Sequence, residues 1–287
     1  MAKTNFDELL KAGVHFGHLK SKWNPAMAPY IFDERKGIHI IDLNKTVVKI
    51  EEAAAAMQSI AKSGRKVLFV ATKKQAKDII VERIRPTTMP YVTERWPGGL
   101  LTNFKTTRRT IKKMTTIEKL LADTGNTNIS KRERLQKSRQ KDKMAKVFGN
   151  IIDMSRLPAA VFLVDVRKED IALLEARKLG IPVFAMVDTN SDPKPIDFVI
   201  PANDDASKSI DLVVTIMANS IQAGLDERKA GKKSGKEETT EEVKAPKAEK
   251  AEKVEKTEKV EKTEKAPKAE KKEAKVEAST EATEGAE

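Results

Sequence analysis

Short continuous apolar runs alternate with longer segments of helical periodicity along the first 224 residues. Residues 67–71 form the clearest run, and five successive apolar residues predict a strand buried on both faces of a sheet. We expect strands at residues 66–72, 89–93, 159–165, 182–187 and 198–200. Alternation of strands with helices predicts one doubly wound α/β domain with mainly parallel strands and right-handed crossovers.

Residues that begin or end helices place the helices between these strands. We expect helices at residues 45–63 and 168–179, with Gly64 and Gly180 directly behind them. Thr72 is a candidate cap for a helix that runs to about residue 84. Residues 203–205 would cap a last helix, which we expect to stop at Gly224.

A long insertion separates the second and third expected strands, and its pattern predicts helices without a strand between them. Asn103 and Ser130 are candidate helix N-caps, and Glu133 lies at capping-box spacing from Ser130. Residues 125–128 have the composition of a loop. The apolar residues fall at helical spacing, densely on the first segment (Ile111, Met114, Ile117 and Leu121) and sparsely on the second (Leu135 and Met144). The pattern predicts a helical hairpin that projects from the α/β body.

Charge sets the insertion apart more strongly than periodicity does. The chain has 55 basic and 43 acidic residues, a net charge of +12, and residues 1–224 hold 38 of the basic and 25 of the acidic ones. Residues 105–146 alone carry 14 basic and 4 acidic residues. Such an excess favours a nucleic-acid backbone, because each neutralised phosphate releases counterions. The alternative is a solvated face of a hairpin. The candidate RNA contacts here are Lys105, Arg108, Arg109, Lys112, Lys113, Lys131, Arg132, Arg134, Lys137 and Arg139.

Residues 225–287 contain 17 basic and 18 acidic residues and no aromatic one, so they offer too little apolar surface to offset the entropy of ordering. We expect this tail to be disordered, with a single charged helix as the alternative. The chain has no cysteine, which excludes disulfides and thiolate metal sites. It also lacks an apolar run long enough to span a membrane and a start typical of a secretion signal, so we expect a cytoplasmic location.

A second candidate site follows the strand at residues 89–93, where α/β folds place their ligands. Gly98 and Gly99 allow close approach of a phosphate, and Arg95 can form a forked contact with one. Trp96 either packs as the anchor of a turn, which we favour, or stacks on a base. Asn103, at the end of this loop, is the remaining candidate RNA contact. The sequence has no Gly-Lys-Ser or Gly-Lys-Thr, so a nucleotide-hydrolysing P-loop is absent.

A third candidate site lies near the beginning of the chain, in a stretch that we expect to be extended or looped. Histidines, aromatics and lysines at this density suit contact with irregular RNA. The candidate contacts are His15, Phe16, His18, Lys20, Lys22, Trp23 and Asn24. A metal site built on His15 and His18 would need further ligands such as His39 or an aspartate, and we expect none.

Aspartates gather near the ends of the later strands, at positions 165, 188, 192, 197, 204 and 205. Paired carboxylates there could bind Mg²⁺ or act as an acid and a base. Residues 187–193 are nevertheless typical of a turn and residues 203–205 of a helix cap. With no Ser–His–Asp or lysine-centred arrangement, we expect no catalytic residues and no cofactor.

Taken together, these segments resemble one family, the second protein of the bacterial small ribosomal subunit. The matching stretches keep one order over about residues 5–225. They are residues 13–18, 23–25 with Met27 and 29–32, 39–43 with Thr46, 95–96, 98–99, 101–103, 157–158, 180–183, 187–193, 200–201 and 203–206.

This resemblance implies a flavodoxin-like sheet with a protruding coiled-coil hairpin and no catalytic activity. It also implies binding to small-subunit ribosomal RNA, a place in translation, and contact with the large first protein of the subunit, which recruits messenger RNA. We therefore divide the chain into an RNA-binding body (residues 1–103 and 150–224), a basic hairpin (104–149) and a tail (225–287) that matches nothing in the family. The competing function is a nucleotide- or phosphosugar-binding α/β enzyme that uses the Trp96 loop and the aspartates.

Overall fold

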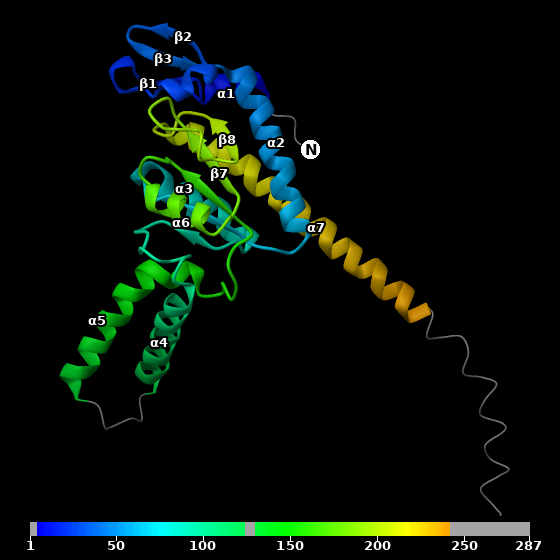
Figure 1. Ribbon diagram of the computed structural model, residues 1–287. Helices are drawn as coiled ribbons and strands as arrows, with labels where there is room; N and C mark the ends of the chain where they lie inside the picture. Colours follow the sequence, from blue (N-terminus) through cyan, green and yellow to red (C-terminus); the bar gives the residue numbers. More distant parts are fainter. Residues whose placement is uncertain (1–4, 124–129, 242–287) are drawn as a thin grey trace, which may run out of the picture. The chain divides into compact units, whose positions relative to one another are not determined.

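Five parallel strands form the central sheet of the computed structural model, which describes residues 5–123 and 130–241 (Figure 1). The strands are β4 (Val67–Val70), β5 (Tyr91–Val92), β6 (Ala160–Val164), β7 (Val183–Val187) and β8 (Phe198–Pro201). Their spatial order is β5-β4-β6-β7-β8, with every neighbouring pair parallel. This is the flavodoxin-like order, in which the direction of winding reverses between the first and third strands. The predicted parallel α/β fold is confirmed.

Helices cover both faces of the sheet. One face packs against α2 (Leu43–Lys62), α3 (Lys74–Ile84) and α7 (Ser207–Glu241). The other packs against α6 (Asp170–Lys178), the segment after β5 and the first turns of α4. Every residue of β6 and β7 is buried, which explains why these strands are continuously apolar rather than alternating.

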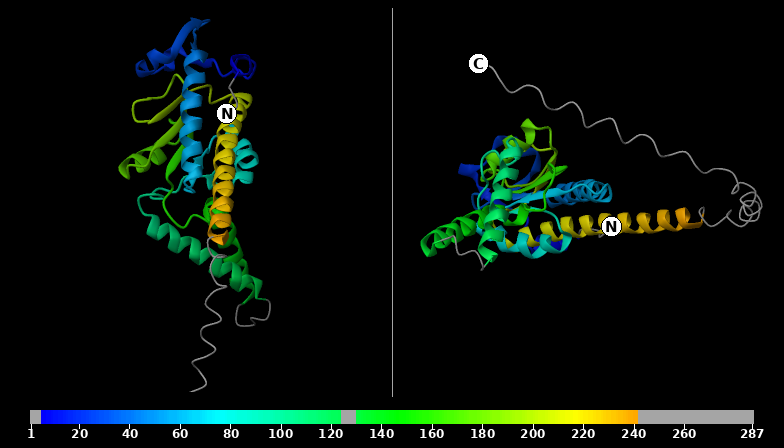
Figure 2. Two further views of the ribbon diagram at one scale, coloured as in Figure 1. Left: turned by 90° about the vertical axis from the view of Figure 1, so that its right-hand side faces the viewer. Right: turned by 90° about the horizontal axis from the view of Figure 1, so that it is seen from below.

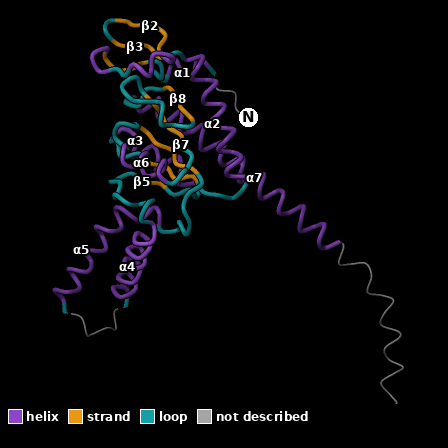
Figure 3. Tube along the Cα trace, in the orientation of Figure 1, coloured by secondary structure: helices purple, strands orange, loops and turns teal. Residues whose placement is uncertain are grey.

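The beginning of the chain forms structure that the sequence analysis missed. After α1 (Phe6–Lys11), strands β1 (Phe16–Leu19), β2 (Ile31–Arg35) and β3 (Ile38–Ile41) make an antiparallel sheet in the order β1-β3-β2 (Figure 3). Two short 3-10 helices, Lys20–Lys22 and Pro25–Tyr30, connect β1 to β2. Lys36 and Gly37 have φ values of 52° and 76°, the pair of positive angles that a two-residue hairpin turn requires.

The insertion forms the predicted helical hairpin. Helices α4 (Phe104–Ala122) and α5 (Lys131–Phe148) pack side by side, and Ser130 Oγ accepts a hydrogen bond from Glu133 N at 3.2 Å. Asn103, in contrast, makes no side-chain cap for α4. The predicted loop at residues 125–128 lies outside the described residues, and a coiled-coil geometry for the pair stays a prediction.

Two helix boundaries differ from those we expected. Thr72 does not cap α3, because its backbone N–H and hydroxyl both donate to the Glu169 carboxylate instead. Helix α7 does not stop at Gly224 but continues to Glu241, so the expectation of disorder from residue 225 is wrong up to residue 241. Residues 242–287 of the predicted tail lie outside the described residues.

Contacts with α2 explain why α7 continues past Gly224. The two helices lie side by side (Figure 2), and a Cβ at Gly224 would be 2.4 Å from the Gln58 carbonyl oxygen. Beyond this glycine, Glu227 pairs with Lys62 at 3.1 Å, and the Arg228 guanidinium lies over Gly64. Gly224 thus serves the close approach of two helices and does not end one.

We expect Gly224→Ala to destabilise the protein by about 1–3 kcal/mol in urea unfolding, because the added methyl group overlaps backbone of α2. Alanine is the better helix former, so a loss would identify crowding as its cause. Gly149→Ala is the matched control, since a Cβ there meets nothing within 4 Å. Equal stability of the Gly224→Ala protein and the wild type would contradict this packing.

Candidate nucleic-acid interface

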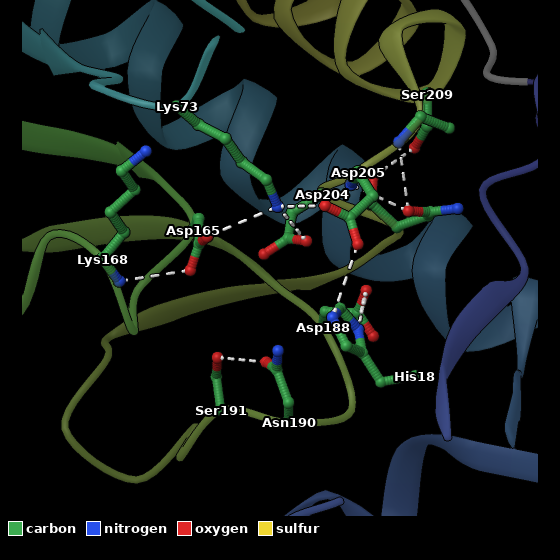
Figure 4. A network of polar contacts seen from close by, with 12 residues as sticks. His18, Lys73, Asp165, Lys168, Asp188, Asn190, Ser191, Asp204, Asp205 and Ser209 are labelled. Carbon is green, nitrogen blue, oxygen red and sulfur yellow. Dashed lines mark hydrogen bonds and ion pairs between the residues drawn. The ribbon is translucent and has the colours of Figure 1, made fainter. Parts of the chain in front are cut away.

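Lys73 lies at the centre of a polar cluster at the carboxyl ends of the strands (Figure 4). Its Nζ atom is 3.4 Å from Asp165 Oδ2, 2.8 Å from Asp204 Oδ1 and 2.6 Å from Asp205 Oδ1. Burial opposes the charge of this lysine, but hydrogen bonds to Asp204 and Asp205 raise its pKa above the ordinary range. Lys73 is therefore charged and joins Asp165, which follows β6, to Asp204 and Asp205, which follow β8.

His18 joins the same cluster from β1. Its Nδ1 atom is 2.9 Å from Asp188 Oδ2, and its Nε2 atom is 3.4 Å from Asp205 Oδ2. The hydrogen bond with Asp188 raises the pKa of His18, whereas burial acts in the opposite direction. Burial also raises the pKa of Asp204 to about 7, and the neighbouring charges of Asp165 and Asp188 add to that shift. Carboxylates outnumber cations here, so the cluster favours bound positive charge.

Three residues of this cluster could hold a divalent cation. Ligand atoms of His18, Asp188 and Asp204 lie within 4.8 Å of one another. One nitrogen and two carboxylate oxygens are common ligands of zinc and other divalent metals. From the sequence, a metal site at His15 and His18 would need His39 or an aspartate as a further ligand. Among the described residues the group contains His18 and two aspartates, but neither His15 nor His39.

Only four of the six aspartates come together as the sequence suggested. Asp165, Asp188, Asp204 and Asp205 surround Lys73 and His18, as described above. Asp192 instead accepts a hydrogen bond from Lys194 N, and Asp197 accepts one from Val183 N. Asp192 thus stabilises its own turn, whereas Asp197 links the residue before β8 to the first residue of β7.

The crevice between β4 and β6, where this fold binds nucleotides, is filled by the chain's own side chains. Glu169 Oε1 accepts hydrogen bonds from the Thr72 backbone N–H at 2.7 Å and from the Thr72 hydroxyl at 2.5 Å. Glu169 is 2% exposed, so a carboxylate already occupies the anion-binding position before α3. A phosphate there would displace or face this carboxylate, so the nucleotide position that is usual for this fold does not support the competing enzyme function.

The turn after β7 holds the N-terminal sheet against the body. Thr189 accepts a hydrogen bond from His18 N at its hydroxyl and one from Asn24 N at its carbonyl, both at 2.8 Å. Gly17 lies so close that a Cβ would be 2.6 Å from the Thr189 side chain. Asn203 N donates to the Val14 carbonyl at 3.1 Å. The motifs at residues 13–18 and 187–193 are therefore two halves of one contact.

Internal contacts occupy several candidate RNA contacts of the N-terminal segment. The Asn24 side chain accepts a hydrogen bond from Ala26 N, and Lys20 pairs with Glu34 at 2.7 Å. The Trp23 ring lies 5.1 Å from the His39 ring. His15 and Phe16 have ring centroids 4.0 Å apart, and burial lowers the pKa of His15. Phe16, Lys20 and Lys22 remain exposed to solvent.

The loop after β5 separates its charged residue from its aromatic one. Trp96 is 7% exposed and packs in the core beneath the sheet, which confirms the favoured packing interpretation. Its Nε1 atom donates to Glu175 at 3.1 Å. Arg95 and Gly98 are exposed, and Gly99 has a φ of 84° that its lack of a side chain permits. Arg95 is thus the residue of this loop that can reach a phosphate.

Sequence reasoning missed Glu175, which lies on the buried face of α6. A signal was available, because Glu175 follows Ala172 by three residues and precedes Ala176, and both alanines are buried. A carboxylate on the apolar face of a helix is rare without partners, so this position predicts a buried polar contact.

Most candidate cations of the hairpin are exposed, but three are also used internally. Arg108 Nη1 donates to the carbonyls of Ile152 at 3.2 Å and Met154 at 3.1 Å, which ties α4 to the segment after α5. Arg134 Nη2 donates to the Leu121 carbonyl, and Lys137 pairs with Glu133. The exposed candidates are Lys105, Arg109, Lys112, Lys113, Lys131, Arg132, Arg134 and Arg139.

Comparisons with known proteins agree on one family. A family model described as ribosomal protein S2 matches residues 9–224. The small ribosomal subunit protein uS2 of Bacteroides fragilis is 64% identical over 232 residues, which cover 81% of this chain and 84% of the relative. The uS2 of Cytophaga hutchinsonii is 57% identical over 242 residues, which cover 84% of this chain and 95% of the relative.

We expect Asp204→Asn to flatten the pH dependence of the unfolding free energy between about pH 4 and pH 7. In the folded protein the pKa of Asp204 is raised from 3.8 to about 7, so the native state binds the proton more tightly than the unfolded state does. Stability from this group is therefore lost as the pH rises through that window, at about 1.4 kcal/mol per pKa unit at most.

Urea unfolding at several pH values, with a chelator present, measures this effect. Asp192→Asn is the control, because Asp192 is exposed and lies outside the cluster. A pH dependence in the Asp204→Asn protein as steep as that of the wild type would contradict the assignment.

Proposed function

The chain belongs to the ribosomal protein S2 family, and from this premise we propose that it is a structural constituent of the small ribosomal subunit that binds small-subunit ribosomal RNA. The relatives are named as small-subunit proteins, and the family is one of ribosomal proteins and not of enzymes. The single observation that carries RNA binding is the basic hairpin of α4 and α5.

The hairpin is suited to a phosphate backbone for two reasons. Its 14 basic residues far exceed its 4 acidic ones, so its own carboxylates cannot neutralise it. Its cations are also spread over two packed helices, with Ile111, Met114 and Ile117 buried between α4 and its neighbours. The apolar residues and three internally bonded cations hold the hairpin, which leaves the other exposed lysines and arginines for a polyanion.

Membership of the family also supports more specific contacts with RNA and protein. We propose that the exposed Arg95, Phe16, Lys20 and Lys22 belong to the RNA interface together with the hairpin cations. We also propose that the protein contacts the large first protein of the subunit, which recruits messenger RNA. A role in translation implies a cytoplasmic, ribosome-bound protein. Within residues 5–123 and 130–241, no helix is long and apolar enough to cross a membrane.

Sedimentation with small ribosomal subunits tests the proposal directly. A tagged full-length chain should migrate with small subunits at physiological salt. Migration at the position of the free monomer, even in low salt, would contradict a structural role in the subunit.

We expect the triple variant Arg109→Glu, Lys112→Glu and Lys113→Glu to bind ribosomal RNA more weakly while its melting temperature stays near that of the wild type. All three side chains are exposed, and Arg108 is left intact because it ties α4 to the body. If each residue contacts one phosphate, the slope of log affinity against log salt should decrease by about 3.

A matched control separates these contacts from net charge alone. Arg177→Glu, Lys178→Glu and Lys208→Glu reverse three exposed charges outside the hairpin. The control should retain most of the salt slope. Equal slopes in both triple variants would show that the hairpin has no special part in binding.

A further inference from the structure

The Glu175 carboxylate accepts hydrogen bonds from four residues of the loop between β5 and α4. Oε1 accepts hydrogen bonds from Trp96 Nε1 at 3.1 Å and Gly99 N at 2.7 Å. Oε2 accepts from Leu101 N at 2.9 Å, Thr102 N at 3.1 Å and the Thr102 hydroxyl at 3.3 Å. One carboxylate thus receives five donors from a single stretch of seven residues.

These bonds keep Glu175 ionised although it is 8% exposed. Burial raises its pKa, but the hydrogen bonds from Gly99, Thr102, Trp96 and Leu101 outweigh burial and leave the pKa below its ordinary value. The donors are neutral backbone and side-chain groups that converge on the anion. Since charge-assisted hydrogen bonds are about twice as strong as neutral ones, the loop is held in one conformation.

The loop held by Glu175 lies between Arg95 and the basic hairpin. Arg95 precedes the anchored residues directly, and α4 begins at Phe104, two residues after Thr102. Leu100 and Leu101 are buried beside Trp96, so the anchored turn is also packed. The carboxylate therefore fixes both the point from which Arg95 extends and the first turn of the basic hairpin.

We propose that Glu175 is the positioning residue of the nucleic-acid interface, which it orders by holding residues 96–102 from beneath. This inference rests on the proposed RNA binding. Glu175 itself contacts no RNA in this arrangement, because the loop covers it. A merely structural residue would change overall stability, whereas a positioning residue changes the loop and the contacts that depend on it.

Glu175→Gln tests the inference in the full-length chain. The amide retains one acceptor oxygen but turns two N–H donors toward the donors of the loop. We expect amide hydrogen exchange of residues 98–103 to quicken about tenfold or more, since one set of bonds to a charged group is lost. Exchange in β6 and β7 should stay as in the wild type. The matched control is Glu82→Gln, which removes the same charge at an exposed position on α3.

Binding to transcribed small-subunit ribosomal RNA supplies the second measurement. Affinity should fall about tenfold in Glu175→Gln, and the additional effect of Arg95→Ala should be much smaller in that background than in the wild type, because coupled residues are not additive. Additive effects of the two substitutions, or quicker exchange throughout β6 and β7 together with weaker binding, would overturn the positioning role.

Two further outcomes complete the test. If Glu175→Gln fails to fold, Thr102→Val removes one donor at nearly constant volume, and it should quicken loop exchange and weaken binding by a factor of about 2–3 in the same direction. No change in either measurement with this variant would overturn the inference.

Wild-type chain that does not bind the RNA would overturn the proposed function and the inference together. Wild-type binding with unchanged Glu175→Gln binding would overturn the inference alone.

Discussion

Burial of the central sheet on both faces constrains every segment that leaves its carboxyl edge. Part of the backbone directly behind the buried strands is out of reach of water, so its polar groups need partners from the chain itself. Glu169 satisfies Thr72, Lys73 joins three aspartates, and Glu175 satisfies the loop after β5. The chain's own carboxylate thereby occupies the anion-binding position before α3, and most of the positive charge available to a partner lies on the inserted hairpin.

The strands and most helices could be predicted because burial leaves a direct trace in the sequence. Continuous apolar runs gave β4, β6 and β7 to within two residues at each end. The end of α7 could not be predicted in the same way. Gly224 has the composition of a helix stop, but its role depends on Gln58 of another helix, which local patterns cannot reveal. The N-terminal sheet was missed for a similar reason, since its strands are short and mostly solvent-exposed.

The candidate sites could likewise be predicted only where they depend on local sequence. Charge density is a property of composition, so the basic hairpin was identifiable without coordinates. Which cations are free to act is a property of geometry, and only the structure distinguishes Arg108, bound to two carbonyls, from exposed Arg109. Four aspartates lie together at one edge as expected, and an aspartate was named as a possible co-ligand of His18, but no pattern in the sequence indicated that Lys73 would join them.

The contact between the N-terminal sheet and the turn after β7 joins residues 171 positions apart, and the Asn203 side chain reaches the Gly13 carbonyl across 190. During synthesis at about 5–20 residues per second, His18 of β1 therefore waits roughly 10–40 seconds for Thr189 to be made. Over that interval β1 can pair with β3, but its contact with the turn after β7 is missing. A closing step of such high contact order is slow, and the nascent chain completes its fold only when nearly all of the sheet has been translated.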